Sequence, residues 1–580
     1  MNRKFDPITS EVIQNSLDST ADEMALVIVR SAYSPVVRDS MDFSTAVCGY
    51  DGRLVAQGLS LAIQLGAFPQ VMRALVSEAT NIQEGDVFLA NDPYGSGGQH
   101  LPDIFVIKPI FFENNLQGYA STMAHHSDVG GIAPGSVAIH AVEIFQEGLR
   151  LPLLKLFEAG KENKTLFSII EKNTRSPVQV IGDLRAQVAA CEAGEKGMIQ
   201  LLKKYGDDEV QFYLEELQLK SERMMRAEIS TIPDGEYTAE DFIDGVGENP
   251  EGLKIAVSIK VNGDTISFDF TGTAKQIPAA LNCPITMSES VAYCAVRCLG
   301  STDIPNCEGY MRPVSVFAPK GTIVNPVLPA ACGARGVVGY RVFDVIMKAL
   351  ASVVPDKIIA GGEGGPTLVS VGGYHQGRPF VLTEVLVGTW GARAGRDGVE
   401  GISNPIANLS NQPVEFIEQE LPLRINRYGL IPDSGGAGRF RGGLAFERKF
   451  EFLSDESTFN LRADRRDHRP YGLEGGEPGA PSSNVMFSGS KQKSLPGMPM
   501  EQIHCKKGDN FLHVSAGGGG FGCPWERDLD CVLDDVQNQK VSIDAAFQKY
   551  KVVIDPESLT INFEETETLR QEAKSLKPLG

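Results

Sequence analysis

The sequence predicts a large, multi-domain α+β protein in which antiparallel hairpins are covered by helices. Its 580 residues exceed what one hydrophobic core normally supports, so about two to four domains are expected. Residues 163–228 carry a mostly helical pattern. Residues 254–273 alternate apolar and polar side chains around Asn262-Gly263, a dipeptide typical of a tight hairpin turn.

The composition changes near Ile232-Pro233, and this change sets the first expected domain boundary. We expect a metal-site region with long helices at residues 1–230 and a central α/β region with glycine-rich loops at 231–440. A mostly β region follows at 441–565, and a polar, mobile tail is expected at 566–580.

Several helix boundaries have recognisable signals. Residues 7–33 form a helical pattern that Thr9 or Ser10 can cap. Ser176-Pro177 is expected to start a long helix that Gly206 ends. Thr286 and Glu289 have the spacing of a capping box before a helix that runs to Leu299.

The densest group of candidate site residues lies between residues 91 and 130. Residues 104–112 and 118–124 read as a hairpin with its turn near Asn114, so facing residues have numbers that sum to about 228. Asp103 then faces His125, with side chains about 5 Å apart, and His100 lies three residues before Asp103. Imidazole and carboxylate together favour zinc, manganese or iron. The alternative is that these histidines are surface or satisfied core residues, because H-x-x-D is common by chance.

The net charge of −20 argues against nucleic acid, because phosphate binding needs clustered Lys and Arg, and also against an anionic membrane surface. The longest apolar runs, such as residues 24–29, are far shorter than the ~20 residues that span a bilayer. The first residues lack the apolar run of a signal peptide. Ten cysteines without a C-x-x-C pair favour core thiols in a reducing compartment. These observations predict a cytoplasmic protein.

Other kinds of catalytic site have weaker signals. The glycine loops at 361–367 and 517–522 match neither a phosphate-binding P-loop nor a dinucleotide fingerprint, so we expect no ATP site of a known loop type. Ser127 lies outside any G-x-S-x-G elbow, and Cys332 has no histidine nearby in the sequence.

Three arginines occur in glycine-rich segments, where they can clamp carboxylates or phosphates, although solvated or structural roles are more common. They are Arg335, Arg393 and Arg396.

Seven segments together resemble the hydantoinase B/oxoprolinase family. This family contains the B-type subunits of ATP-dependent hydantoinases, 5-oxoprolinases and caprolactamase, and it is related to a large subunit of acetone carboxylase. The resemblance runs in the family's order from about residue 5 to residue 555. The segments are RDSMDFSTAV, NDPYGSGGQHLPD, AHHSDVGG, EIFQEGLRLP, FDFTGT, DSGGAGRFRGG and SAGGGGFGCPWERD.

The resemblance implies a set of site residues. The family's metal ligands carry over to Asp42, His100, Asp103 and His125, with Asp39 as a weaker alternative to Asp42, and the metal would be zinc or manganese. His126 and Asp128 follow directly and are the candidate catalytic residues, either for proton transfer or for orienting His125. Their alternative role is local: a turn capped by Asp128 before Gly130-Gly131.

The resemblance also implies a partner and a reaction. An A-type subunit of actin/hexokinase-like fold would bind ATP and Mg and phosphorylate the carbonyl oxygen of a cyclic amide. This chain would complete ring opening of a hydantoin, 5-oxoproline or lactam with metal-activated water, in an A2B2 assembly. The alternatives are a component of an acetone-carboxylase-like ligase and a non-catalytic scaffold in which the metal only orders the hairpin.

Overall fold

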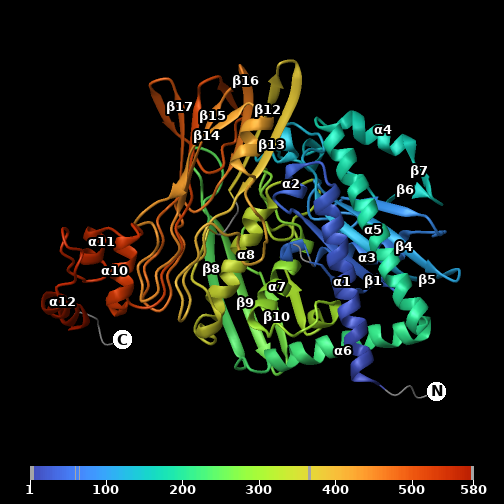
Figure 1. Cartoon of the computed structure of the whole chain (residues 1–580), viewed down its shortest axis with the longest axis horizontal. Helices are drawn as coiled ribbons and strands as arrows, with labels where there is room; N and C mark the ends of the chain where they lie inside the picture. Colours follow the sequence, from blue (N-terminus) through green and yellow to red (C-terminus); the bar gives the residue numbers. More distant parts are fainter. Residues whose placement is uncertain (1–4, 59–60, 65, 364–366, 576–580) are drawn as a thin grey trace.

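The computed structural model describes residues 5–58, 61–64, 66–363 and 367–575, and it confirms the α+β class (Figure 1). Four sheets are present in the described chain, and their strands pair mostly antiparallel, with β10 and β11 parallel. None of the helices in these residue ranges is long and apolar enough to cross a membrane.

The N-terminal part is built on a seven-stranded sheet in the order β2-β1-β5-β4-β3-β6-β7. Helices α1 and α5 pack side by side, and α5 lies against β4 and β5 (Figure 1). The strands are β1 (Phe43–Gly49), β2 (Leu54–Gln57), β3 (Val87–Ala90), β4 (Asp103–Phe112), β5 (Asn115–His125), β6 (Leu154–Glu158) and β7 (Lys161–Glu162). The helices are α1 (Pro7–Ser31), α2 (Pro35–Arg38), α3 (Ala67–Glu78), α4 (Lys164–Asn173), α5 (Pro177–Tyr205) and α6 (Asp207–Ile229), with short 3-10 turns at Ala62–Gln64, Pro134–Ser136 and Ile144–Gln146.

Both faces of this sheet are buried, and alternate residues enter different cores. Val106 and Ala124 join the core shared with α1 and α5, whereas their neighbours Phe105 and Met123 join the core shared with α3, α7 and the second sheet. Successive side chains on a strand point to opposite faces. Whether a residue of β4 or β5 has an odd or an even number therefore decides which of the two cores its side chain joins.

The predicted hairpin forms with the predicted register. Asp103 pairs with His125, and the pairing continues through Ile110 opposite Gly118. Glu113 and Asn114 form the two-residue turn, with φ of 50° and 66°, as a tight hairpin turn requires.

The predicted helices form, but some caps differ from expectation. Helix α1 is capped by Asp6, whose carboxylate accepts hydrogen bonds from the backbone of Ile8 and Thr9. Helix α5 begins at Pro177, and Gly206 with φ of 80° separates it from α6, as expected.

The capping box predicted at Thr286 and Glu289 is wrong. Helix α7 (Ile285–Leu299) begins after Pro284 without a side-chain cap. The hydroxyl of Thr286 donates to the Gly98 carbonyl at 2.9 Å, and the Glu289 carboxylate accepts from the Gln70 amide. Tertiary partners thus replace the local cap.

The second sheet, in the order β11-β10-β9-β8, packs against α7 and α8 (Arg335–Leu350). The predicted hairpin at Asn262-Gly263 joins β9 to β10. Its strands are β8 (Gly235–Ile243), β9 (Leu253–Asn262), β10 (Thr265–Asp269) and β11 (Val314–Phe317), and 3-10 turns occur at Glu308–Met311 and Pro355–Lys357.

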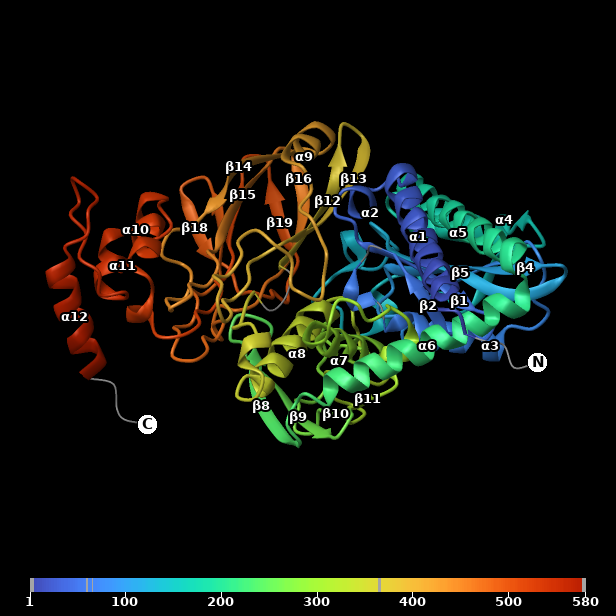
Figure 2. The ribbon, with the colours of Figure 1, turned by 60° about the horizontal axis from the view of Figure 1, so that its bottom comes forward.

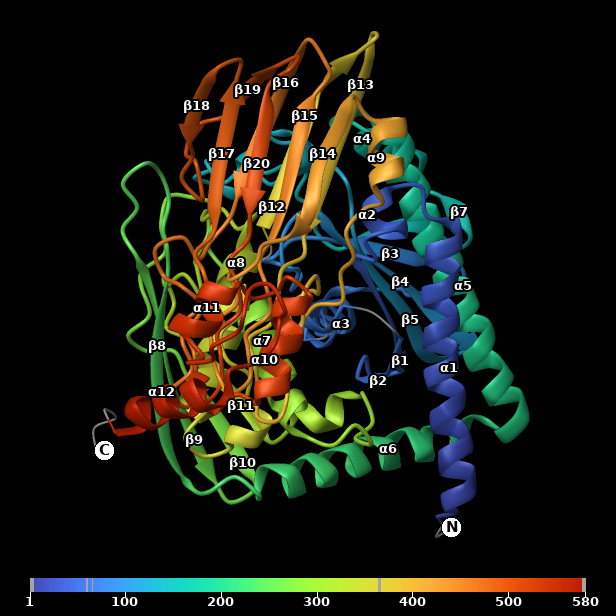
Figure 3. The same cartoon turned by 60° about the vertical axis from the view of Figure 1, so that its left-hand side comes forward.

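Two further sheets, β13-β12-β16-β19 and β14-β15-β20-β17-β18, pack face to face (Figure 3). Strands β12–β14 lie in the region expected to be central, but they share these sheets with the C-terminal strands. The strands are β12 (Thr367–His375), β13 (Arg378–Leu386), β14 (Leu423–Leu430), β15 (Phe446–Phe452), β16 (Glu456–Arg462), β17 (Ser483–Ser488), β18 (Lys491–Ser494), β19 (Ile503–Lys506) and β20 (Asn510–Val514), with α9 at Val414–Glu420.

The chain ends in three helices at the far side of the molecule from α1 (Figure 2). They are α10 (Leu529–Gln537), α11 (Ile543–Gln548) and α12 (Phe563–Ser575), preceded by a 3-10 turn at Pro524–Glu526. Residues 566–575, which we expected to be a tail, are therefore helical. The remaining five tail residues lie outside the described residues.

Glycine-rich segments of the C-terminal half pack backbone against backbone. A Cβ atom at Gly442 would lie 1.9 Å from the Gly518 carbonyl oxygen, and one at Gly476 would lie 2.2 Å from that of Gly520. Glycine is required here by close packing as well as by turns.

Candidate metal centre

The predicted metal ligands gather where three neighbouring strands meet. Asp42 directly precedes β1, His125 ends β5 and Asp103 begins β4. Strand β1 pairs with β5, and the backbone N–H of His125 donates to the Asp42 carbonyl at 2.9 Å. By the alternation of the strands, the Asp103 and His125 side chains lie on the sheet face that carries Phe105 and Met123, away from α5.

Three side chains converge there. One ligand atom each from His100, Asp103 and His125 lies within 4.8 Å of the other two. The two imidazole rings are 4.9 Å apart between centroids, and His100 Nε2 lies 3.1 Å from Asp103 Oδ1. All three residues are buried.

Each of these three side chains has a buried polar atom that the rest of the described chain leaves unsatisfied. Within the described residues, His100 Nε2 and Asp103 Oδ1 have no partner beyond each other, and His125 Nδ1 is buried without a partner, although buried polar atoms are normally satisfied. His100 Nδ1 lies 3.2 Å from the Gly333 carbonyl. If it donates to that acceptor, Nε2 presents a lone pair towards Asp103. Three converging lone pairs fit a divalent metal ion, and two imidazoles with a carboxylate suit zinc or manganese.

The surroundings keep these residues in the protonation states that bind metal. Burial and then the charge of Arg335 lower the pKa of His100 to about 4. Burial and the neighbouring His100 lower the pKa of His125 well below its usual value. Burial opposes ionisation of Asp103, but the Arg335 guanidinium and His100 outweigh it and hold the pKa of Asp103 well below its ordinary range. At neutral pH the site thus offers neutral imidazoles and a carboxylate.

Asp42 lies beside this group but is not one of the three that converge. Its Oδ1 accepts a hydrogen bond from Gln64 Nε2 at 3.0 Å. Burial and the nearby charge of Asp103 raise the pKa of Asp42 to about 7. The alternative ligand, Asp39, instead bonds Arg38 through both carboxylate oxygens.

A second layer of residues, absent from our sequence-based ligand set, holds the site. The Gly333 carbonyl accepts from His100 and also from Arg462 Nη1 at 2.9 Å. The Glu147 carboxylate in turn accepts from the backbone of Cys332 at 3.1 Å and of Gly333 at 2.5 Å. Burial raises the pKa of Glu147 to about 7. A Cβ atom at residue 333 would lie 2.9 Å from Glu147 Oε1, so glycine lets this contact form.

Two of these residues had some signal in the sequence. Arg335 belongs to the group of arginines in glycine-rich segments, and its guanidinium pairs with Asp103. Glu147 lies in the EIFQEGLRLP segment. Arg462 lies in a strand without any recognisable motif, and only the fold brings it to Gly333.

His126 and Asp128 are held away from the three converging ligand atoms. His126 Nε2 lies 3.0 Å from Gln187 Oε1 on α5, because residue 126 faces the opposite side of the strand from His125. Asp128 accepts from the backbone of Gly130 at 2.9 Å and pairs with Arg175 at 3.0 Å. The contacts of Asp128 fit the structural alternative, a carboxylate-capped turn, and the contact of His126 fits packing against α5.

The two alternative nucleophiles, Ser127 and Cys332, also lie in surroundings that do not favour nucleophilic attack. The hydroxyl of Ser127 lies 3.0 Å from that of Ser176. Burial and the neighbouring Glu147 raise the pKa of the Cys332 thiol well above its usual value, which disfavours the thiolate needed for nucleophilic attack.

Known proteins are similar to this chain over nearly its whole length. A model of the family described as Hydantoinase B/oxoprolinase matches residues 6–524. The B subunit of a putative D-/L-hydantoinase from Pseudomonas sp. (strain NS671) is 36% identical over 588 residues, covering 98% of each chain.

Two solved structures are also similar. The crystal structure of an ATP-dependent caprolactamase from Pseudomonas jessenii has a TM-score of 0.91 and 29% identity, covering 98% of this chain and 100% of that one. An acetone carboxylase in a nucleotide-free structure has a TM-score of 0.90 at 18% identity, covering 98% of this chain and 83% of that one. At this identity the second likeness concerns the fold alone.

Proposed function

Because the chain belongs to the hydantoinase B/oxoprolinase family, we propose that it is the metal-bearing B subunit of an ATP-dependent hydrolase that opens a cyclic amide at its C–N bond. The observation that supports the metal most directly is the convergence of three buried ligand atoms, one each from His100, Asp103 and His125, on side chains with polar atoms that no other group satisfies among the described residues. The reaction class, hydrolysis of a cyclic amide, is taken from the similar hydantoinase subunit and caprolactamase.

His100, Asp103 and His125 would hold a divalent ion, zinc or manganese, and we propose Asp42 as the fourth ligand. Such an ion supplies a Lewis acid that lowers the pKa of bound water towards ~7. The chain's own part is to fix the ligands. Arg335 keeps Asp103 ionised, and the Gly333 carbonyl orients the His100 ring.

We propose that a second subunit carries out the ATP chemistry. An amide is a poor electrophile, and phosphorylation of its oxygen makes the ring carbon electrophilic enough for water to add. The C–N bond would then break as the ring nitrogen takes a proton, and hydrolysis of the resulting acyl phosphate would release inorganic phosphate. The sequence contains no P-loop, so an A-type subunit of actin/hexokinase-like fold would bind ATP and Mg, in an A2B2 complex. Hydantoins, 5-oxoproline and lactams are the substrates to be compared.

The test is to purify this chain with its A-type partner and to screen hydantoins, 5-oxoproline and lactams for substrate-dependent ADP release. We expect hydrolysis by the wild-type complex and its loss, together with loss of bound metal, in His100→Ala. A His100→Ala complex that is folded and metal-free but hydrolyses its substrate at the wild-type rate would contradict the catalytic proposal in favour of a scaffold role.

Two further measurements complete the test. Calorimetry on the isolated chain should detect no ATP binding, and tight binding would show that the nucleotide site is not on the partner. The fold shared with acetone carboxylase makes a ligase component the second candidate. ATP-dependent consumption of acetone with bicarbonate, in a complex with a third small subunit, would favour it.

A further inference from the structure

Arg462 differs from the other buried arginines because it pairs with no carboxylate. Seven arginines are buried in the part of the chain that the structure describes. Six of them form an ion pair, and Arg462, at 5% exposure, is the exception among these residues. The paired six are Arg335, Arg341, Arg441, Arg448, Arg465 and Arg527. The few residues that the structure does not describe include no Asp or Glu.

A buried charge normally requires an ionic partner. Burial and then the charge of Arg335 lower the pKa of Arg462 to about 10, so its guanidinium is still charged at neutral pH. Its Nη1 donates to the Gly333 carbonyl at 2.9 Å, and its Nε is buried without a partner among the described residues. The Glu147 carboxylate accepts from the N–H of Gly333 instead. The guanidinium therefore has a neutral acceptor but no paired anion.

The Arg462 side chain reaches the metal centre from a different part of the chain. Arg462 ends β16 of the C-terminal sheets, whereas Asp103 and His125 belong to the N-terminal sheet. The Gly333 carbonyl that accepts from Arg462 also lies 3.2 Å from His100 Nδ1. Binding sites commonly form where two parts of a fold meet in this way.

The charges at the metal centre favour an anion beside the ion. The carboxylates of Asp42 and Asp103 balance the guanidinium groups of Arg335 and Arg462, and the imidazoles are neutral. A bound divalent ion would therefore add two positive charges. Burial raises the pKa of Glu147 to about 7, so this carboxylate offsets at most one of them.

The accessible side of the centre carries the positive groups. Four of its side chains keep an exposed fraction of 5–7%, whereas His100 and Asp103 keep none. The four are Asp42, His125, Arg335 and Arg462. Arg335 also begins α8, which has no side-chain cap, and a helix N-terminus adds a partial positive charge. An anion that enters from solvent would thus meet these groups first.

We propose that Arg462 binds an oxyanion beside the metal centre, and that this anion is the phosphoryl group that the partner subunit places on the substrate. The inference rests on the proposed function and assigns a binding residue to it. The Arg462 Nε–H, which no protein group accepts among the described residues, is the donor assigned to a phosphoryl oxygen. Guanidinium groups suit phosphate because their planar fork can donate to two oxygens.

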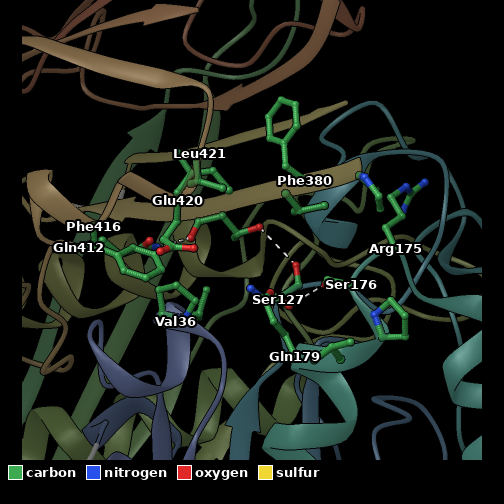
Figure 4. Close-up of a pocket in the computed structure, with 17 residues that line it drawn as sticks. Val36, Ser127, Arg175, Ser176, Gln179, Phe380, Gln412, Phe416, Glu420 and Leu421 are labelled. Atoms are coloured by element: carbon green, nitrogen blue, oxygen red, sulfur yellow. Dashed lines mark hydrogen bonds between the residues drawn. The ribbon is translucent and has the colours of Figure 1, made fainter. Parts of the chain in front are cut away.

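Arg175 shows the ordinary alternative and provides a control. It lies beside a pocket of about 380 Å³ whose lining residues include none of the predicted metal ligands (Figure 4). Its guanidinium pairs with the buried Asp128 at 3.0 Å and donates to the carbonyls of Gly130 and Gly131. Because its charge is already balanced, we expect Arg175 to bind no anion.

The test measures binding of inorganic phosphate to the full-length chain loaded with manganese, without ATP or partner. Calorimetry gives the affinity, and the relaxation of the ³¹P nucleus by manganese shows that the phosphate lies near the metal. We expect phosphate to bind about tenfold or more tightly than acetate, because it carries more charge and more acceptor oxygens.

Arg462→Gln should weaken phosphate about 10- to 100-fold, as expected for the loss of a hydrogen bond between charged groups. Arg462→Lys keeps the charge but loses the planar fork, so it should weaken phosphate less. Arg175→Gln is the matched control and should bind phosphate like the wild type. Elemental analysis and thermal melts identify the variants that are folded and loaded with metal. If Arg462→Gln does not fold, Arg462→Lys decides the result.

The inference is overturned if the loaded wild type binds no phosphate, if acetate binds as tightly, or if the folded Arg462 variants keep wild-type phosphate affinity. Phosphate binding through Arg462 in a chain whose complex hydrolyses no cyclic amide would count against the proposed function and leave the anion site in place. Hydrolysis by the complex, with phosphate affinity unchanged in Arg462→Gln, would count against the anion site alone.

Discussion

The carboxylates of Asp103 and Asp464 are both fully buried and both meet an arginine, but their remaining surroundings differ. Asp464 pairs with Arg341 and also accepts from the backbone of Asp244 at 2.9 Å. Arg341 and Arg465 share the carboxylate of Asp241, each at 3.0 Å. Asp103 pairs with Arg335 through one oxygen, and its other oxygen lies 3.1 Å from His100 Nε2 without a further partner among the described residues.

Both clusters contain arginine Nε atoms without a partner among the described residues, on Arg335 and Arg462 at one and on Arg341 and Arg465 at the other, but they differ in their remaining unsatisfied atoms. The unpartnered buried nitrogens at the Asp464 cluster include Nε of Arg341 and Nε of Arg465, which are N–H donors. The unpartnered atoms at the Asp103 cluster include a carboxylate oxygen and imidazole nitrogens. Unpaired N–H donors offer no ligand to a cation, whereas converging lone pairs do. A buried ion pair by itself therefore does not indicate a metal site, but the identity of its unsatisfied atoms does.

The strongest test of this contrast is to neutralise each carboxylate in turn. Asp103→Asn should lower metal affinity about 100-fold, because it removes an anionic ligand. Asp464→Asn should keep the metal and instead destabilise the fold by about 3 kcal/mol, since it removes one of the two carboxylates that pair with the buried Arg341 guanidinium. Elemental analysis and urea unfolding of both variants provide the measurement. Equal metal content in the two folded variants would contradict the conclusion that only the Asp103 cluster binds metal.

Removal of the metal should destabilise only chains with an intact Asp103 cluster. An ion present at 100 times its dissociation constant stabilises the folded state by about 2.7 kcal/mol. We expect chelation to lower the melting temperature of the wild type and of Asp464→Asn by a similar amount. His100→Ala should show no such change in a thermal melt. A chelator effect of wild-type size in His100→Ala would place the stabilising ion elsewhere.

The pH dependence of metal binding tests whether Asp42 is a ligand. Its pKa in the metal-free chain is raised to about 7 by burial and by Asp103, and only the ionised carboxylate binds metal. Affinity should therefore fall about tenfold per unit as pH drops below 7, through competition with this proton. In Asp42→Asn the dependence should begin only near pH 4, where His100 gains a proton. Competition titrations against a chelator measure both slopes, and identical slopes would exclude Asp42 from the ligand set.

The smallest expected effect concerns Glu147, which holds the peptide of Gly333 that orients His100. Glu147→Gln should reduce metal affinity about tenfold, as for other residues that support ligands, and should alter the visible spectrum of the cobalt-substituted protein. Glu384→Gln, at another buried glutamate that pairs with Arg448, is the control for burial. If the cobalt spectrum of Glu147→Gln were the same as that of the wild type, the role of Glu147 would be limited to packing.

Local regularities allowed part of this arrangement to be predicted. Hairpin pairing depends on the turn position alone, so the pairing of Asp103 with His125 followed from the sequence. Period-two alternation also explains why His126 faces α5 although it adjoins His125. Asp42 entered only through the family resemblance, because no local rule predicts that β1 pairs with β5.

The supporting residues could not be predicted, because their contacts cross large sequence separations. Arg335 reaches Asp103 across 232 residues, and Glu147 reaches Gly333 across 186. The same cause explains the failed capping box, since the hydroxyl of Thr286 bonds a carbonyl 188 residues away. Local pattern rules describe what a segment can do alone, and tertiary partners override them when they bind the same polar group more favourably.

The long separation between Asp103 and Arg335 has a consequence for how the chain is made. At synthesis rates of about 5–20 residues per second, the segment with Asp103 and His125 precedes its arginine by roughly 10–50 s. During that interval the nascent hairpin presents carboxylate and imidazole without the guanidinium that later closes over them. In a ribosome-bound fragment that ends before α8, the metal-binding side chains would therefore be more exposed to solvent and would bind metal ions less selectively than in the finished protein.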